Sequence, residues 1–305
     1  MISYPEAPGF SDADLSPFFK DADTNSNRAQ KHYTTQIRYQ LILLVIAAIA
    51  GVFTFRWRHQ GADYAGIVGA AAFGATIFIR LFAEQQGDER EWYESRAAAE
   101  SAKTLCWRFA VAGNPFPESM SDQDSKRLLI DRFNDIGREL EYIAASTSDG
   151  GEVTAAMISL RHAHRKERIL AYNKGRIQAQ QAWYAGKSDW NERRARTWLK
   201  ITLSAEAIGL IGAIIKATAI TELDLLGVFA ALAVATGAWL ETKQHRTLAT
   251  AYNVTARELR QVSTLLDEHM SAEEWANFVD QAEEAISREH TMWVASRTGR
   301  RLESK

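Results

Sequence analysis

The chain has 305 residues, of which 46% are hydrophobic and 24% are charged, with 36 Lys and Arg against 38 Asp and Glu. This composition excludes a long disordered or collagen-like chain, and a net charge of −2 argues against a protein that binds nucleic acid through a basic surface. A single cysteine, Cys106, excludes an internal disulfide and a cysteine-rich metal site, and five prolines with 18 glycines favour helices over a turn-rich β protein.

Residues 1–37 are polar and lack the basic stretch and apolar core of a signal peptide. Pro5, Pro8 and Pro17 stand among serines, aspartates and asparagines. This pattern predicts a disordered tail that ends at about residue 25.

Four segments concentrate the apolar residues, at about residues 39–55, 64–80, 199–216 and 224–241. Each is somewhat shorter than the roughly 20 helical residues that cross a hydrocarbon core of about 30 Å, so a soluble bundle of four buried helices is the alternative. We favour transmembrane helices because the segments are apolar around the whole helix, whereas a soluble helix keeps a polar face.

The ends of these segments carry long cationic and aromatic side chains, which extend a short span into the membrane interface. They are Arg38, Tyr39, Arg56, Trp57, Tyr64, Arg80, Trp198, Lys200, Lys216 and Trp239. Short connections at 56–63 and 216–224 join the segments pairwise. The sequence therefore predicts an all-α membrane protein with four transmembrane helices in two hairpins and long cytoplasmic helices that form a bundle.

A basic stretch sets the expected orientation. Residues 161–200 hold eleven Lys or Arg against Glu167, Asp189 and Glu192, an excess of eight next to the third segment. The positive-inside rule then places residues 81–200 in the cytoplasm, and two spans per hairpin return both termini to that side. The part nearest the span is the candidate surface for anionic lipid headgroups or a nucleotide, with lipid the default. It comprises Arg193, Arg194, Arg196 and Lys200.

Small residues recur four apart in two of the segments, a spacing that lets helix backbones approach closely. The second segment has Gly66, Ala70 and Gly74, and the third has Ala205, Gly209 and Ala213. We expect these faces to pack, although Gly and Ala are common in membrane helices generally.

The chain outside the spans is predicted to be helical. The second span continues through 84–110, and Ser121 with Asp124 caps a helix that extends to about residue 147. A long helix is expected over 152–184, and Ser271 with Glu274 forms a capping box before a final amphipathic helix.

The glycines at 150 and 151 mark the expected domain boundary. Residues 1–150 then form a first two-transmembrane unit and residues 151–305 a second, because a shift of about 159 residues brings the second span onto the fourth. The repeat is one of pattern rather than of identical residues.

No motif indicates catalysis, since the chain has no phosphate-binding loop, GxSxG, HExxH or CxxC. Cys106 lies among large apolar residues, which favours a packed thiol over a nucleophile. His162 and His164 lack the i,i+4 spacing of a metal pair. An acidic group near the C-terminus is more simply the polar side of an amphipathic helix than a metal cluster; it comprises Glu283, Glu284, Glu289 and His290. We expect no enzyme activity, cofactor or metal.

Glu206 is the one carboxylate in the interior of a predicted span rather than at its end, with Thr202 four residues earlier and Ser204 nearby. Ionisable residues in membrane helices usually face a protein interior or a water-filled path. The three residues are therefore pore-lining candidates. The alternative is a carboxylate near the interface that pairs with Lys200 or Arg196.

Three groups of residues resemble a known family. The first is Tyr172-x₃-Arg176-Ile177-x₃-Gln181-x-Trp183-Tyr184 with Lys187 and Asn191; the second is Tyr252, Ala256-x-Glu258-Leu259 and Glu283/Glu284-x-Ile286-x₂-Glu289-His290-x₂-Trp293; the third is Trp92-Tyr93, Arg96, Ala99-Glu100 and Trp107. They resemble SLATT domains, two-transmembrane effector domains associated with SMODS nucleotidyltransferases and SLOG nucleotide sensors. The resemblance covers roughly residues 30–300 as two tandem units.

This resemblance implies a non-enzymatic effector of the bacterial inner (cytoplasmic) membrane that assembles as a homo-oligomer and forms a pore or channel in anti-phage defence. It implies membrane lipid, further copies of the chain, and a nucleotide second messenger or a nucleotide-sensing protein as partners, and no nucleic acid. The alternative function is a membrane-anchored helical scaffold or sensor whose hairpins only tether it.

Overall fold

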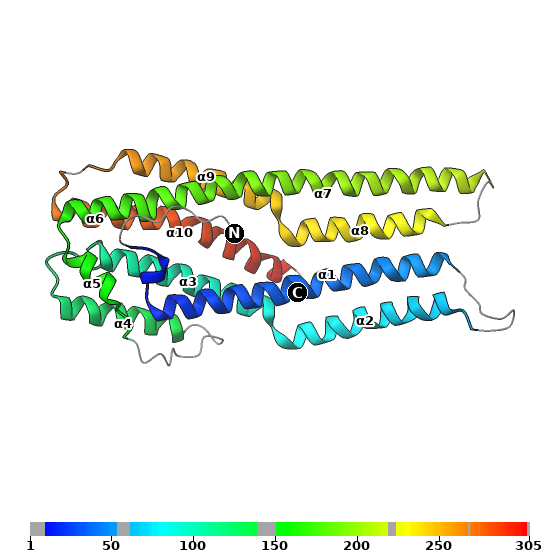
Figure 1. The fold of residues 1–305 in the computed structure, drawn as a ribbon, viewed down its shortest axis with the longest axis horizontal. Coiled ribbons are helices and arrows are strands. Elements are labelled where there is room, and N and C mark those ends of the chain that lie inside the picture. The colour runs from blue at the N-terminus through cyan, green and yellow to red at the C-terminus, as the bar shows by residue number, and fades with distance from the viewer. Residues whose placement is uncertain (1–9, 54–61, 139–150, 219–223, 268, 304–305) are drawn as a thin grey trace. The chain divides into compact units, whose positions relative to one another are not determined.

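The computed structural model describes residues 10–53, 62–138, 151–218, 224–267 and 269–303, with side chains described up to residue 287. Every regular element in these ranges is helical (Figure 1). The elements are η1 (Asp12–Asp14), α1 (Pro17–Val52), α2 (Tyr64–Gln86), α3 (Asp88–Ala110), α4 (Asp122–Arg138), α5 (Ala155–His162), α6 (Arg165–Tyr172), η2 (Asn173–Gln178), α7 (Ala179–Ala217), α8 (Leu225–Lys243), α9 (His245–Thr264) and α10 (Ala272–Glu303). The predicted all-α class is confirmed.

The chain divides into two compact units. The bundle unit comprises Met1–Ala29, Glu89–Ser188 and Thr250–Lys305, and the span unit comprises Gln30–Asp88 and Asp189–Ala249. Helices α1 and α7 each contribute residues to both units. Both units combine residues from before and after residue 150, so the division into two sequence repeats there stays a prediction.

Aromatic side chains fill the core of the bundle unit. The Tyr172 ring lies between two indoles, with centroids 5.9 Å from Trp107 and 5.7 Å from Trp275, both at edge-to-face angles. The indole Nε1 of Trp275 donates to the carbonyl of Val111 at 2.7 Å, so its polar group is satisfied although the side chain is fully buried. These contacts join α3, α6 and α10 around one core.

Both predicted caps are confirmed. The backbone N–H of Asp124 donates to Ser121 Oγ at 3.2 Å, and α4 follows with Leu129 and Phe133 buried. The N–H of Glu274 likewise donates to the Oγ of Ser271, whose own N–H donates back to the Glu274 carboxylate. Such reciprocal bonds satisfy donors that a helix start leaves unpaired.

The disordered tail expected to residue 25 is wrong from residue 10 onward; residues 1–9 lie outside the described part. Helix α1 begins at Pro17, a residue whose fixed φ suits the first helical position. Leu15 and Ala22 are 0% exposed within the bundle core. Apolar residues between the polar ones therefore order this segment by burial.

The helix expected to run without interruption through residues 84–110 is broken. Gly87 ends α2 in the left-handed conformation with φ 67°, and Asp88 begins α3. The same break recurs after the fourth apolar segment, where Gln244 adopts φ 50° between α8 and His245, the first residue of α9. We call these positions the first joint (Gly87 and Asp88) and the second joint (Gln244 and His245).

The single helix expected over 152–184 is also interrupted, at Ala163 and His164. Arg168 Nη1 donates to the carbonyl of Arg161 at 3.0 Å, which satisfies an acceptor freed by the end of α5. Arg161 and Arg168, on either side of this interruption, are both buried. Further along, η2 is a π-helical turn before α7.

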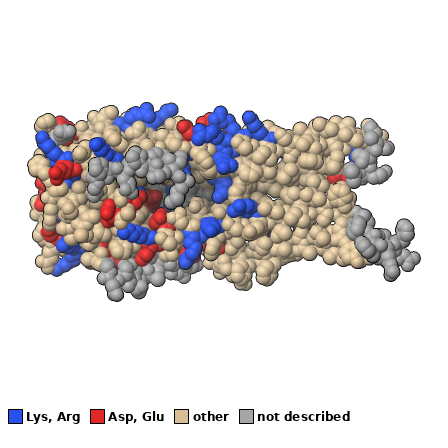
Figure 2. Space-filling view, in the orientation of Figure 1, with Lys and Arg blue, Asp and Glu red and all other residues tan. Residues whose placement is uncertain are grey.

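Four helical stretches are long and apolar enough to cross a membrane: Pro17–Val52, Tyr64–Ala110, Arg165–Ala217 and Leu225–Thr264. Their most apolar windows are only 6–17% buried inside the chain, which leaves large apolar side chains exposed. On the face in Figure 2, the apolar surface carries almost no charge and Lys and Arg gather where it ends. A surface of this kind suits lipid rather than water.

Candidate functional site

Small residues form the contact between α7 and α8 in the span unit. Ala205 is 3% exposed. A Cβ atom added to Gly209 would lie 3.3 Å from the Cβ of Phe229, and one added to Gly212 would lie 2.7 Å from the Cβ of Leu225. Ascending positions in α7 meet descending positions in α8, so the two helices are antiparallel (Figure 1). Gly212 was not in the predicted stripe, whose third member, Ala213, is only half-buried.

The three pore-lining candidates have different surroundings. Thr202 Oγ1 lies 2.9 Å from Thr236 Oγ1 of α8, so this hydroxyl belongs to the contact between the two helices. Ser204 and Glu206 are exposed on α7. Among the described residues no cation pairs with Glu206, and Arg196 pairs instead with Glu192 at 3.6 Å. The expected alternative, a pair between Glu206 and Lys200 or Arg196, is therefore not formed here.

Helices α1 and α2 pack through a different face of α2 from the expected one. A Cβ added to Gly69 would lie 3.4 Å from the Cβ of Ala50. Ala72 and Thr76 are buried, whereas the predicted stripe is exposed. That stripe comprises Gly66, Ala70 and Gly74. Within the chain, these small residues leave an open helix face.

The basic stretch 161–200 is only partly a surface feature. Arg161, Arg168 and Arg176 are 6%, 5% and 0% exposed. The guanidinium of Arg161 donates to four backbone carbonyls and to Ser125 Oγ, which lies 2.8 Å away. These arginines are structural and cannot contact lipid. The four candidate flank residues, by contrast, are exposed on α7: Arg193, Arg194, Arg196 and Lys200.

A buried ion pair lies at the centre of the bundle unit, between η2 and α10. Arg176 Nε and Nη2 donate to the two carboxylate oxygens of Glu283 at 2.9 and 2.7 Å. Tyr172 and Thr104 donate hydroxyl hydrogen bonds to the same carboxylate at 3.0 and 2.9 Å. Burial lowers the pKa of Arg176, but Glu283 raises it above its ordinary value, so the arginine stays charged.

The expectation that Glu283 lies on the polar side of its helix is wrong, because its side chain is 0% exposed. Glu284 is exposed as expected, and the side chains of Glu289 and His290 lie outside the described part. The sequence signal that could have found the pair is Arg176 itself, which follows the buried Tyr172 at helical spacing.

A polar contact closes the second joint. His245 is 4% exposed, and its Nδ1 lies 2.7 Å from Oδ1 of Asn191 on α7. The pKa of His245 is lowered to about 4, mainly by burial and also by the positive charges of Lys243 and Arg194. The imidazole is therefore neutral at pH 7 and its Nδ1–H donates to the asparagine.

Acidification should destabilise the protein through His245. Its pKa in the folded chain lies below the ordinary value, so the unfolded chain binds more protons between about pH 6.5 and pH 4. We expect a loss of about 2 kcal/mol as the pH falls through this window. Thermal unfolding of the full chain at pH 7 and pH 4.5 should show a larger drop for the wild type than for His245→Gln; equal drops would contradict the prediction.

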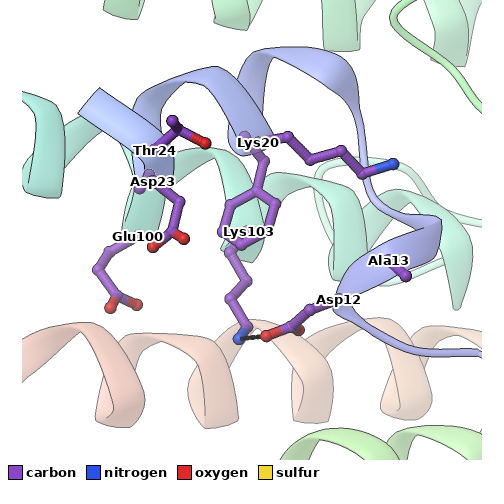
Figure 3. Close-up of a pocket in the computed structure, with 9 residues that line it drawn as sticks. Asp12, Ala13, Lys20, Asp23, Thr24, Glu100 and Lys103 are labelled. Atoms are coloured by element: carbon purple, nitrogen blue, oxygen red, sulfur yellow. Dashed lines mark hydrogen bonds and ion pairs between the residues drawn. The ribbon is translucent and has the colours of Figure 1, made fainter. Parts of the chain in front are cut away.

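A cleft of about 320 Å³ lies in the bundle unit beside α1 and α3 (Figure 3). Its lining residues are Asp12, Ala13, Phe19, Lys20, Asp23, Thr24, Ala99, Glu100 and Lys103. Lys103 pairs with Asp12 at 2.6 Å, while burial raises the pKa of Asp23. With three carboxylates and two amines, this lining does not favour a phosphate.

Cys106 is fully buried, and burial raises the pKa of its thiol to about 11. A thiol of this kind is a poor nucleophile. Within the described residues, no group of three or more His, Cys, Asp or Glu side chains could hold a metal ion.

Four helical stretches of the described chain, two before residue 150 and two after it, are long and apolar enough to cross a membrane, which indicates a helical membrane protein. Residues 16–169 match the SMODS and SLOG-associating 2TM effector domain 3, and residues 172–293 match the SMODS and SLOG-associating 2TM effector domain 1. The chain therefore belongs to the SLATT family and carries two SLATT domains in tandem. No curated protein and no solved structure matches it significantly.

Proposed function

We propose that the protein is a non-enzymatic, oligomeric membrane effector that forms a pore or channel in nucleotide-signalled anti-phage defence. The two SLATT domains support a role as a membrane effector linked to SMODS and SLOG proteins. The observation that carries the pore is Glu206, an exposed carboxylate on an otherwise apolar helix. A charge facing hydrocarbon is costly, so polar surroundings outside the single chain are needed.

In this proposal α1 with α2 and α7 with α8 form two transmembrane hairpins, and both termini are cytoplasmic in a bacterial inner membrane. Basic residues support the orientation, because Arg193, Arg194 and Lys200 lie exposed towards one end of the spans. At the other end of the second hairpin, Lys216 lies 3.7 Å from Asp224, which offsets its charge. This asymmetry agrees with the positive-inside rule.

Further copies of the chain complete the pore. The open face of Gly66, Ala70 and Gly74 allows close approach of another helix, and a ring of Glu206 carboxylates would share the water path. The acidic cleft of the bundle unit favours a nucleotide-sensing partner protein over direct binding of a nucleotide there.

Replacing Glu206 by Gln should alter ion selectivity while leaving assembly intact, because it removes the charge and keeps the shape. Planar bilayer recordings of purified wild type and Glu206→Gln would measure the ratio of cation to anion permeability. Glu241→Gln is the matched control, since Glu241 is exposed near the end of α8. Unchanged selectivity for Glu206→Gln would overturn the pore-lining role, and assembled protein without currents would favour the scaffold.

A further inference from the structure

Two carboxylates in the acidic cleft of the bundle unit have no cationic partner. Asp23 accepts a hydrogen bond from Asn27 Nδ2 at 3.0 Å, and within the described part of the chain no ion pair joins Asp23 or Glu100 to a cation. The ammonium of Lys103 pairs with Asp12 instead. Asp23 and Glu100 lie at the same end of the cleft, and Asp23 is exposed (Figure 3).

The same cleft also offers apolar surface. Its volume is about 320 Å³, and Ala13, Phe19 and Ala99 line it together with the carboxylates. A guanidinium side chain suits both features, because its head forms charge-assisted bonds with carboxylates and its methylene stem packs on apolar atoms. Arginine also binds a carboxylate bidentately, which lysine does not.

Helix α9 carries the opposite charge on the bundle unit. Arg257 and Arg260 are exposed, and in the described ranges neither forms an ion pair. They are three residues apart, so their side chains are neighbours on one helix face. Between Thr250 and Thr264, the part of α9 that belongs to the bundle unit, the one acidic residue is Glu258, which is half-buried. The exposed face is therefore basic.

Helix α4 differs from α9 in this respect. It exposes Arg127 and Arg132, but Asp131 between them is exposed as well. A surface of mixed charge attracts a pair of carboxylates less than a surface of one sign. On α9, two apolar residues accompany the arginines: Val254 is 47% exposed and Leu265 is 68% exposed.

The acidic cleft and the basic face of α9 lie on different sides of the bundle unit. Residues of η1, α1 and α3 line the cleft, and α9 contributes none. In Figure 1, α6 and α10 lie between α9 and α1. The two surfaces have opposite charge but do not pair within one chain, so each is available to another copy.

We propose that α9 of one copy docks into the acidic cleft of a neighbouring copy. Arg257 and Arg260 then pair with the two carboxylates at Asp23 and Glu100. This inference rests on the oligomer in the proposed function and names its interface in the bundle unit. Each copy uses two different surfaces, so the contact is head-to-tail and forms a ring when its rotation closes. A partner protein that binds the cleft would compete with the neighbouring copy.

Charge reversal on each surface tests the contact. Arg257→Glu/Arg260→Glu makes both surfaces of a chain acidic, and Asp23→Lys/Glu100→Lys makes both basic. We expect each variant to self-associate about 100-fold more weakly than the wild type, because like charges replace opposite ones. Mass photometry of the full chain in detergent, at several protein concentrations, measures this affinity.

The matched control reverses the same number of charges on α4. Arg127→Glu/Arg132→Glu should assemble like the wild type, because α4 takes no part in the contact. Thermal unfolding followed by circular dichroism checks that all variants are folded. If the control lost as much affinity as the α9 variant, net charge would explain the loss and the proposal would be overturned.

A mixture of the two charge-reversed variants gives an independent measurement. The acidic α9 face of one variant fits the basic cleft of the other, and the remaining two surfaces keep their wild-type charges. We therefore expect an equimolar mixture to assemble into oligomers with equal numbers of both chains, which native mass spectrometry resolves by mass. Folded variants that stay monomeric when mixed would overturn the proposal.

These measurements separate the contact from the pore, because assembly is counted without currents. If the variants lose assembly and recover it on mixing while the wild type conducts no ions, the contact is supported and the pore is contradicted. If both variants assemble like the wild type, the contact is overturned whatever the currents show. A wild-type chain that stays monomeric at every concentration would overturn it as well.

Discussion

Replacing Arg176 by Ala should lower the free energy of unfolding by about 3–5 kcal/mol, because the change leaves the Glu283 carboxylate buried without a cationic partner. Both side chains are 0% exposed, and two charge-assisted bonds of 2.9 and 2.7 Å join them. Tyr172 and Thr104 would remain as donors but carry no charge. Thermal unfolding of the full chain in detergent, followed by circular dichroism, measures the loss.

The matched control for this experiment is Arg196→Ala. Arg196 pairs with Glu192 at 3.6 Å with both side chains more than 60% exposed, and exposed pairs contribute at most about 1 kcal/mol. The double variant Arg176→Met/Glu283→Leu should recover most of the stability, since a buried ion pair can be replaced by packed apolar groups. Equal losses for Arg176→Ala and Arg196→Ala would show that the buried pair has no special role.

Gly212→Val should destabilise the pairing of α7 with α8 by about 1–3 kcal/mol through overpacking. An added Cβ would lie 2.7 Å from the Cβ of Leu225, an atom too close to the backbone to move aside. In lipid, the hydrophobic effect does not drive membrane helices together, so close van der Waals packing contributes much of the free energy of their association. Titration of the purified chain with sodium dodecyl sulfate would measure the lost resistance to unfolding.

Gly237→Val is the matched control, because an added Cβ there meets nothing within 4 Å although Gly237 lies in α8 of the same helix pair. Both substitutions introduce the same β-branched residue into a helix, so their propensity costs cancel. If the two variants were equally sensitive to detergent, the role of Gly212 in the contact between α7 and α8 would be contradicted.

Local patterns predicted those features that depend on few neighbours. The apolar segments and the caps at Ser121 and Ser271 follow from hydropathy and from bonds between residues three apart, and all are present. Ion pairing across the fold escaped prediction, since Arg176 and Glu283 are 107 residues apart in the chain. Their side chains are polar by composition and buried only because two distant helices meet.

The backbone conformation at the two joints also could not be predicted fully from neighbouring residues. Gly87 is a residue that commonly ends a helix, but Gln244 has no such preference and still adopts φ 50°. The burial of His245 and its bond to Asn191 stabilise that conformation, and both depend on the position of α7.

The sequence by itself determined the all-helical class, the four apolar helices and the membership of two SLATT domains, because hydropathy and helical spacing are properties of neighbouring residues. Tertiary structure alone decided which faces of those helices pack. It buried Arg161, Arg168, Arg176 and Glu283, and it exposed Glu206 and the stripe of α2. The physical reason is that the rotation of each helix about its axis is set by the partner it contacts, and a basic stretch of sequence becomes surface or core accordingly.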